Sequence, residues 1–305
     1  MSLNPTRRAF TSLAVSVFMF STRSAWASSS SLWPGREDAA TKAAQTSLGA
    51  LEAGKGGRLG VFALNTMSHR QISYRAEERF SMCSTHKFLT VAAILERVDA
   101  GRLNLNQQVS YGQADILAYA PITRQHLKAG SMSVAALCAA AIEWSDNTAA
   151  NLLLKLIGGP VGWTRYARSI GDNVSRLDRT EPTLNEATPG DMRDTTSPYA
   201  MARDIDAILR GQVLTTPSRQ LLEGWMLDNQ ITNPLLRAGV PAGWRVADKS
   251  GSGDHGTRND IGLILPPAPG GAIIAAVYYT ESPQPASARD ALIAKTGQII
   301  ASTLT

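Results

Sequence analysis

The chain has 305 residues, of which 44% are hydrophobic, and it carries a formal net charge of +5. This length and apolar content predict a globular protein with a substantial core, organised as one large domain or two modest ones. The Lys and Arg residues are scattered rather than striped, which argues against a nucleic-acid-binding surface, and no basic amphipathic helix suggests membrane binding. A small soluble molecule is the expected partner.

Residues 1–27 carry the features of an export signal peptide. Arg7 and Arg8 precede an uncharged run at 10–20 that is too short to span a bilayer comfortably, and small residues at 25 and 27 form a cleavage signal. The order around the two arginines resembles a twin-arginine signal, with a general secretory signal as the alternative. Loss of this segment removes Arg7, Arg8 and Arg23 and no acid, so the formal charge falls from +5 to +2. We expect a periplasmic or secreted protein.

The mature chain begins and ends with helix and strand signals. Residues 37–53 predict an amphipathic helix, and 58–65 and 71–75 predict two strands of a hairpin. Near the other end, Gly and Pro turns separate three further strands, and 286–302 predicts a closing helix. The three late strands are predicted in "GWRVADKSGSG", "TRNDIGLILP" and "GAIIAAVYYT".

Between these ends the pattern is helical from residue 84 to about 224, and no strand signal interrupts it convincingly. The economical architecture is an α/β fold of the α+β type: an antiparallel five-stranded sheet flanked by terminal helices, with an inserted all-α domain and a cleft between the two. We predict a discontinuous sheet domain at 28–80 and 225–305, and an all-α domain at 81–224.

A serine and a lysine stand three residues apart where the apolar helix after Met82 begins. Positions i and i+3 share a helix face, so Ser84 and Lys87 can meet if Ser84 opens the helix. A serine hydroxyl is a weak nucleophile at neutral pH, and a nearby base can activate it. The alternative is that Ser84 only caps the helix and Lys87 is a solvated surface charge.

The four histidines lie far apart and show no metal-ligand spacing, so we expect no metal site and no cofactor. His86 stands between Ser84 and Lys87 but points away from them on a helix, and we expect it to be structural or solvated. Two cysteines, Cys83 and Cys138, suffice for one disulfide, but we expect two free thiols.

Three later stretches add to the Ser-x-x-Lys pair: "SDN" at 145–147, "RTEPTLN" at 179–185 and "KSG" at 249–251. In this order and at these separations, the four motifs resemble those of a class A serine β-lactamase. The resemblance covers essentially the whole mature chain and includes flanking stretches such as "SDNTAANLLL" and "LLRAGVPAGW". It implies the fold of serine β-lactamases and penicillin-binding proteins, and hydrolysis of penicillins and of cephalosporins.

The resemblance implies a catalytic set. Ser84 is the nucleophile, and its activating base is either Lys87 or Glu181 acting through a water. The N–H groups of Ser84 and Ser252 would stabilise the oxyanion. Ser145 would pass a proton from Lys87 toward the departing nitrogen, and Glu181 with Asn185 would activate the water that hydrolyses the acyl-serine ester.

The resemblance also implies residues that bind substrate and residues that stabilise the loop. We expect Asn147 to bind the side-chain amide of the substrate, and Tyr119 to form an aromatic wall, although Tyr119 is equally compatible with a surface tyrosine. Arg179 and Asp194 would pair across the base of the Glu181 loop. The substrate carboxylate would be bound by Lys249, Ser250, Gly251, Ser252 and Arg258.

The sequence departs from the family pattern at two cysteine positions. Val91 stands where many members carry the partner of Cys138, and Gly253 stands where carbapenem-hydrolysing members carry the partner of Cys83. We therefore expect weak carbapenem hydrolysis. The 179–185 and 249–260 stretches look closer to cefotaxime-hydrolysing relatives, whereas Arg258 is more typical of broad penicillinases, so the cephalosporin range stays open.

Two other functions share part of the motif set. A penicillin-sensitive D,D-peptidase or transpeptidase has the Ser-x-x-Lys, Ser-x-Asn and Lys-Thr-Gly elements but lacks the Glu181 and Asn185 arrangement. A non-catalytic β-lactam sensor domain would be acylated once and would normally be tethered to a membrane. Nothing in the sequence suggests more than a monomer.

Overall fold

The computed structural model describes residues 1–2, 35–267 and 270–305. The predicted signal peptide at 1–27 therefore lies outside the described residues, apart from its first two. The segment from Trp33 to Thr305 forms one compact unit. No helix of the described segments is long and apolar enough to cross a membrane.

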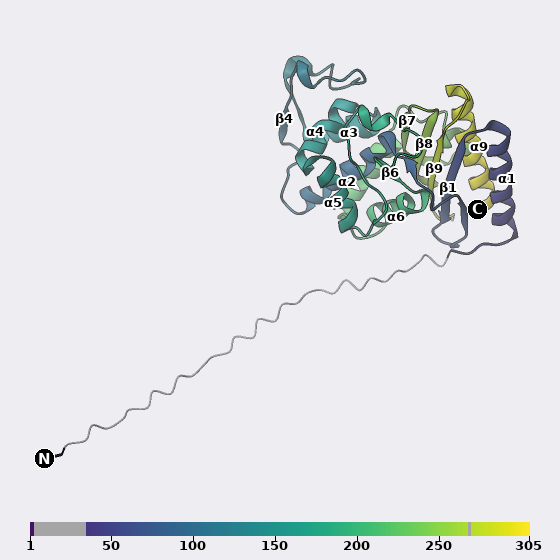
Figure 1. The fold of residues 1–305 in the computed structure, drawn as a ribbon, viewed down its shortest axis with the longest axis horizontal. Coiled ribbons are helices and arrows are strands. Elements are labelled where there is room, and N and C mark those ends of the chain that lie inside the picture. The colour runs from purple at the N-terminus through teal and green to yellow at the C-terminus, as the bar shows by residue number, and fades with distance from the viewer. Residues whose placement is uncertain (3–34, 268–269) are drawn as a thin grey trace. The chain divides into compact units, whose positions relative to one another are not determined.

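Five antiparallel strands form the main sheet, in the order β2-β1-β9-β8-β7 (Figure 1). Strand β1 pairs with both β2 and β9, so the beginning and the end of the compact unit meet in one sheet. Strand β7 lies at the edge, which leaves one side of its backbone free of strand partners. The predicted fold class is confirmed. The strand bounds are β1 (Arg58–Asn65), β2 (Gln71–Tyr74), β7 (Arg245–Gly253), β8 (Thr257–Leu265) and β9 (Ile273–Thr280).

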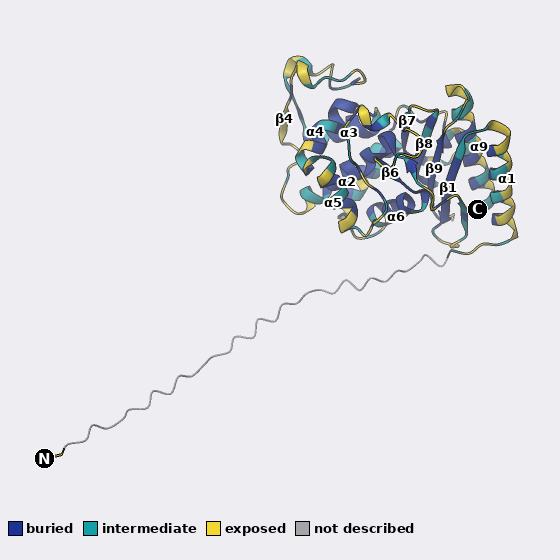
Figure 2. Ribbon diagram, viewed as in Figure 1, coloured by how far each residue is buried: buried dark blue, intermediate teal, exposed yellow. Residues whose placement is uncertain are grey.

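Both faces of the sheet are buried. Along β1, Leu59 and Val61 belong to a cluster with the terminal helices, whereas Phe62 belongs to the cluster of the helical region. This division follows the two-residue alternation of a strand. The first face is covered by α1 (Ala39–Lys55) and α9 (Ala286–Leu304), whose outer sides are exposed (Figure 2). The predicted flanking of the sheet by its terminal helices is thus confirmed.

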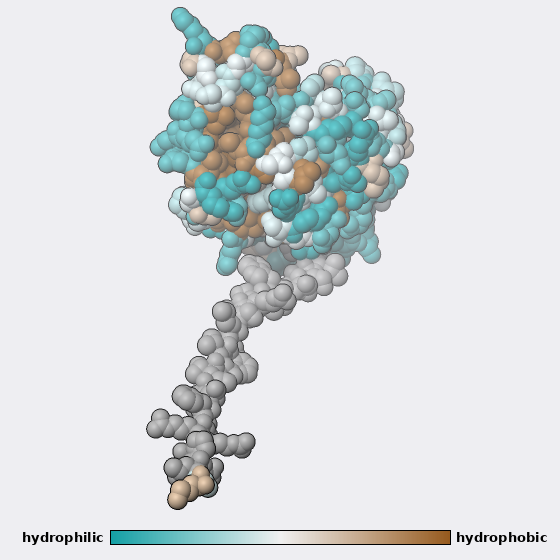
Figure 3. Space-filling model, turned by 60° about the vertical axis from the view of Figure 1, so that its left-hand side comes forward, coloured by the Kyte–Doolittle hydropathy of each residue, from teal (hydrophilic) through white to brown (hydrophobic). Residues whose placement is uncertain are grey.

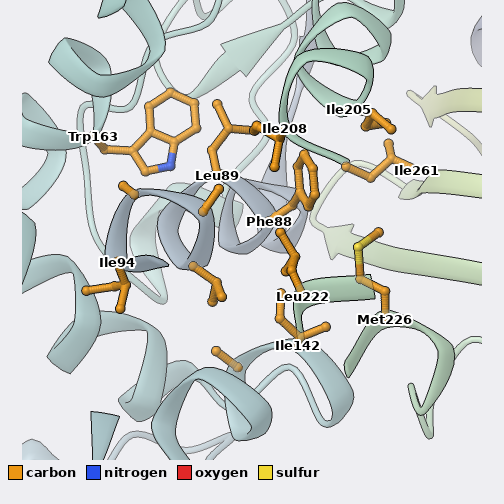
Figure 4. Close-up of a cluster of buried hydrophobic side chains, with 14 of the residues drawn as sticks. Phe88, Leu89, Ile94, Ile142, Trp163, Ile205, Ile208, Leu222, Met226 and Ile261 are labelled. Carbon is orange, nitrogen blue, oxygen red and sulfur yellow. The ribbon is translucent and has the colours of Figure 1, made fainter. Parts of the chain in front are cut away.

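The helical region surrounds α2 (His86–Asp99), whose residues from His86 to Leu95 are all buried. Figure 4 shows apolar side chains from other helices, including Ile142 and Trp163, packed around Phe88 and Leu89 of α2. This packing fixes the helix that follows Ser84. The other helices are α3 (Val134–Glu143), α4 (Asn147–Ile157), α5 (Gly159–Ser169), α6 (Pro198–Leu209), α7 (Thr216–Leu227) and α8 (Leu236–Gly239).

The prediction that no strand interrupts the helical middle is wrong. Strand β4 (Gln108–Ser110) pairs with β5 (Ser131–Ser133), and β3 (Phe80–Ser81) pairs with β6 (Thr195–Thr196). Strands of two or three residues are too short to show a two-residue hydrophobic period. The β3–β6 pair connects the predicted sheet domain to the predicted all-α domain. The domain boundaries near residues 80 and 224 stay a prediction.

Cys83 and Cys138 are both free, in line with the expected free thiols, and both are buried. Burial raises the pKa of each thiol far above its ordinary value, which makes both thiols unreactive. On the surface, one face shows a strip of hydrophobic residues beside a larger hydrophilic area (Figure 3). Apart from Met1, the large exposed apolar residues of the described segments are Met67, Tyr119, Trp144, Val161 and Met192.

Candidate active site

A cleft of about 350 Å³ brings together residues from every motif of the sequence analysis. It is bordered by the segment before α2, the turn before α4, the Glu181 loop, and strands β7 and β8. A larger cavity of about 650 Å³ lies against α9, but Lys295 is its one charged lining residue among those described, so it offers little catalytic chemistry. The cleft is lined by Ser84, Tyr119, Ser145, Asn147, Asn185, Ile231, Ser250, Ser252 and Arg258.

Ser84 lies in a short 3-10 helix, η1 (Cys83–Thr85), that leads directly into α2. Its hydroxyl donates to Glu181 Oε1 at 3.1 Å and caps no helix. The β7 strand passes close to this segment, because a Cβ at Gly251 would lie 2.7 Å from the carbonyl oxygen of Met82. Glycine at this position therefore allows the substrate-binding strand to approach the nucleophile.

Lys87 is completely buried, so its interpretation as a solvated charge is wrong. Its Nζ lies 3.0 Å from Glu181 Oε1 and donates to Asn147 Oδ1 at 2.6 Å and to Ser145 Oγ at 3.1 Å. Burial lowers the pKa of Lys87, and the negative charge of Glu181 opposes that change. The ammonium group therefore links the nucleophile side of the cleft to the Glu181 loop.

Ser145 and Asp146 form the turn between α3 and α4, and Asn147 is the first residue of α4. Asp146, not Ser145, caps α4 by accepting a hydrogen bond from the Ala149 amide, which leaves the Ser145 hydroxyl in the cleft. That hydroxyl accepts hydrogen bonds from Lys87 and, at 3.0 Å, from Lys249. Burial, followed by the positive charge of Lys87, holds the pKa of Lys249 well below its ordinary value.

Glu181 is buried and faces the nucleophile from an irregular loop. Its Oε2 accepts a hydrogen bond from Asn185 Nδ2 at 2.5 Å. Its backbone N–H and C=O are both bonded to the side-chain amide of Asn151 on α4, at 3.0 and 2.9 Å. Burial alone would raise the pKa of Glu181, but Lys87 and His86 outweigh it and hold that pKa well below the usual range. The carboxylate is therefore charged and accepts hydrogen bonds on both oxygens.

An internal ion pair holds the base of this loop. Arg179 Nε donates to Asp194 Oδ2 at 2.6 Å, and the other oxygen of Asp194 accepts the amides of Asp178 and Arg179. Side-chain exposure is only 14% for Arg179 and 1% for Asp194, so solvent screens the pair weakly. Arg179 also contacts Glu186 within the loop. The predicted pair between Arg179 and Asp194 is present.

The outer wall of the cleft carries a second arginine. Arg258 Nη1 donates to Ser252 Oγ at 2.6 Å across the β7–β8 ladder, and its Nε donates to Asp290 of α9 at 2.7 Å. Asp290 therefore fixes the guanidinium over the strand edge that carries Ser250 and Ser252. Tyr119, with 47% of its surface exposed, also lines the cleft.

Sequence reasoning missed three residues that hold this site. Asn151 and Asp290 lie within helices and belong to no motif. The one available signal was the amide of Asn151 between apolar residues in "TAANLLL". The alternative that His86 is solvated is wrong, and its direction toward Glu181 was not predicted. Its ring is completely buried, and Nε2 lies 3.5 Å from Glu181 Oε1, because the loop folds over the face of α2 on which His86 lies.

The described residues include no group of three or more His, Cys, Asp or Glu side chains placed to hold a metal ion. The chemistry that these residues can perform is nucleophilic. A buried serine hydroxyl touches a charged carboxylate, two buried amines converge on a second hydroxyl, and a cleft with an arginine opens beside them.

Comparison with known proteins gives the family. A model of the β-lactamase enzyme family matches residues 42–304. The chain is 45% identical to β-lactamase CTX-M-97 of Escherichia coli, over 84% of this chain and 87% of that protein. It is 43% identical to β-lactamase OXY-2 of Klebsiella oxytoca, over 89% and 91%. The solved structure of a class A β-lactamase described as the last common ancestor of Gram-negative bacteria superimposes with a TM-score of 0.84 at 52% identity, covering 86% of this chain and 100% of that one.

The fold and site thus define a serine hydrolase of the β-lactamase type. The chain belongs to the β-lactamase enzyme family and is a class A serine β-lactamase.

Proposed function

We propose that this protein opens the β-lactam ring of penicillins and cephalosporins in two steps, through an acyl-enzyme on Ser84 that Glu181 hydrolyses. One observation carries the proposal: the Glu181 carboxylate lies within hydrogen-bond reach of the Ser84 hydroxyl, at 3.1 Å, although the two residues are 97 positions apart in the chain. A peptidase or a sensor that is acylated once needs no carboxylate at this place.

In the first step, Ser84 Oγ attacks the lactam carbonyl carbon and its proton passes to a base. The contact of the hydroxyl with Glu181 supports Glu181 as that base, whereas Lys87 donates to Ser145 and Asn147. The N–H groups of Ser84 and Ser252 would stabilise the oxyanion, and loss of one such donor typically costs about 10²- to 10³-fold in rate.

The ring C–N bond then breaks and its nitrogen needs a proton. Ser145 Oγ accepts hydrogen bonds from both Lys87 and Lys249, so its own O–H is available to donate toward the cleft. The two buried amines can then replace the proton that Ser145 gives up, since burial lowers the pKa of each.

In the second step, water cleaves the acyl-serine ester. Glu181 first passes the proton that it took from Ser84 to Lys87, whose Nζ lies 3.0 Å away and which has given up a proton by way of Ser145. Because acylated Ser84 no longer donates to Glu181, the recharged Oε1 can then accept a proton from water while Asn185 donates to Oε2. Attack of that water on the ester carbonyl breaks the bond to Ser84 Oγ, and the proton returns to the serine.

Substrate recognition follows from the charge on the cleft wall. Arg258 and Lys249 flank Ser250 and Ser252 on the strand edge, and a β-lactam carboxylate fits this cationic, hydrogen-bonding surface. Gly251 keeps the strand close to the nucleophile. Asn147 and Tyr119 line the cleft where a side-chain amide and its substituent would lie. Both named relatives are β-lactamases, which supports β-lactams as the substrate class.

The decisive experiment uses purified mature protein and a chromogenic cephalosporin. We expect many turnovers from the wild type and a trapped covalent adduct, seen by mass spectrometry, in Glu181→Ala. Glu77→Ala, which alters an exposed carboxylate, serves as the control and should turn over normally. A burst of one product per enzyme from the wild type would contradict the proposal and favour a peptidase or a sensor.

The proposed place of action is the periplasm, with the enzyme working as a monomer. The twin-arginine route rests on Arg7 and Arg8 alone, and replacing both by Lys tests it. If that route is used, the double variant should accumulate inside the cell as precursor, whereas a general secretory substrate should still be exported.

A further inference from the structure

His86 occupies an unusual place for a histidine that the proposed reaction does not use. It lies at the start of α2, between the nucleophile and Lys87, and is completely buried. Its Nε2 lies 3.5 Å from Glu181 Oε1 and has no hydrogen-bond partner at ordinary distance in the described part of the chain. A buried polar atom without a full partner is costly, so its orientation toward the carboxylate calls for an explanation.

The surroundings of His86 fix the ring. Its Nδ1 lies 3.1 Å from Thr90 Oγ1, one helical turn further along α2, and its carbonyl oxygen accepts a hydrogen bond from the Trp163 indole at 3.1 Å. If Nδ1 carried the proton, the lone pair of Nε2 would face the Glu181 carboxylate, which is repulsive. The Thr90 hydroxyl has one proton and lies 3.1 Å from both Nδ1 and the His86 carbonyl oxygen. The carboxylate therefore favours the neutral ring in which Nε2–H is directed at Glu181 and Nδ1 accepts the Thr90 proton.

We propose that His86 is a positioning residue for deacylation: its Nε2–H donates to Glu181 Oε1 and keeps that carboxylate aimed at the ester. The proposal rests on the function proposed above. Three donors face Oε1. The Ser84 hydroxyl can no longer donate once it is acylated, and the Lys87 ammonium group also donates to Ser145 and Asn147. His86 Nε2 has no other partner among the described residues, and unlike the Ser84 hydroxyl it is not lost on acylation. A contact that is long in the free enzyme can shorten once the serine proton is gone.

Three charged groups face the imidazole. Glu181 approaches from the loop, Lys87 is the next residue of α2, and Lys249 lies on β7, whereas α5 contributes the uncharged Trp163. Burial, reinforced by the two lysines and opposed by Glu181, lowers the pKa of His86. The ring is therefore neutral at neutral pH and adds a donor without adding a third positive charge, which would stop Glu181 from acting as a base.

The test compares two variants of the mature enzyme. His86→Phe keeps a flat ring at a buried position and removes the donor, whereas His86→Gln places an amide N–H near the position of Nε2. We expect the acyl-enzyme of His86→Phe to persist about 3- to 10-fold longer than that of the wild type, with the acylation rate changed less, because one weak hydrogen bond to a charged group is lost. His86→Gln should recover most of the wild-type lifetime.

The pH profile separates positioning from packing. Loss of a donor to the charged carboxylate raises the pKa of Glu181. The acidic limb of the pH profile of the deacylation rate should therefore move to higher pH in His86→Phe, by about half a unit. In His86→Gln this limb should lie close to its wild-type position. Thr90→Val, which frees Nδ1, should shift the same limb in the same direction and provides a test if His86→Phe does not fold.

Three results would overturn the inference: wild-type lifetime and pH profile in His86→Phe, equal changes in the Phe and Gln variants, or, if His86→Phe does not fold, a wild-type profile in Thr90→Val. In the first case His86 only fills space, and in the second its effect is one of packing. Failure of the proposed function would look different, because the wild type itself would then stop after a single turnover.

Discussion

The nucleophile side of the cleft is built from regular elements, η1 with α2 and strand β7, whereas the Glu181 side is built from irregular chain. Backbone ladders and a buried apolar helix hold the first side, through many contacts of which each contributes little. The second side depends on a few buried polar contacts: the Asn151 amide, the pair between Arg179 and Asp194, and the donors around Glu181.

This difference separates the two chemical steps. Apart from Glu181, which serves both steps, the groups for acylation stand mainly on the regular side, so single substitutions outside the cleft should change acylation less than deacylation. The Glu181 carboxylate, which activates water for deacylation, stands on the irregular side. Loss of one hydrogen bond there can move this carboxylate out of its catalytic position. Variants of the loop should therefore lengthen the life of the acyl-enzyme, whereas variants of the strand edge should weaken substrate binding.

The largest effect is expected from Asn151→Leu. This change removes both hydrogen bonds to the Glu181 backbone and leaves a buried N–H and C=O without partners, so deacylation should slow by about 10²-fold. Stopped-flow measurement of acyl-enzyme decay checks this. Asn65→Leu is the matched control, because it removes a buried amide that bonds Leu304 far from the cleft. If both variants lose stability but neither slows deacylation, the comparison between the two sides fails.

A smaller effect is expected from Arg179→Ser. Breaking a buried ion pair leaves Asp194 uncompensated and costs about 3–5 kcal/mol in stability, although the amides that Asp194 accepts will reduce that cost. We expect a lower melting temperature and about 10-fold slower deacylation of small substrates. Arg193→Ser, which breaks an exposed pair in the same loop, should change neither measurement. An unchanged acyl-enzyme lifetime in Arg179→Ser would rule out a role for this pair in the loop.

An effect no larger than that of Arg179→Ser, and with a different signature, is expected from Arg258→Ala. Loss of the guanidinium removes a cation from the carboxylate-binding wall, so KM for penicillins should rise about 10-fold while kcat falls less. Steady-state kinetics on a penicillin measures the split. Arg245→Ala, at the exposed opposite end of β7, controls for general loss of charge. A fall in kcat with unchanged KM would place Arg258 on the catalytic rather than the binding side.

Much of the fold could be read from local patterns. Strand signals at 58–65 and between the Gly and Pro turns near the other end predicted the sheet, and the helical period predicted a helical middle and the closing helix, with small errors at the ends. The short strands β3 to β6 escaped because two or three residues carry no period. The motif residues were found by their resemblance to a family, since each motif alone also fits a turn or a cap.

His86 shows where the local reading failed. Helical geometry correctly placed it on a different face of α2 from the nucleophile, and the error was to assume that this face meets solvent or core. The Glu181 loop returns to that face from almost one hundred residues further along the chain. No pattern within α2 carries information about which segment will cover it.

By itself, the sequence determined the kinds and order of the elements, the buried character of α2 and the chemical types available for catalysis, because periodicity and residue chemistry are local properties. Only the tertiary structure decided that Ser84, Lys87 and Glu181 meet within about 3 Å, that Asn151 holds the loop, and that a histidine faces the carboxylate. Those contacts join segments far apart in the chain, and their formation depends on how the whole core packs rather than on the residues beside them.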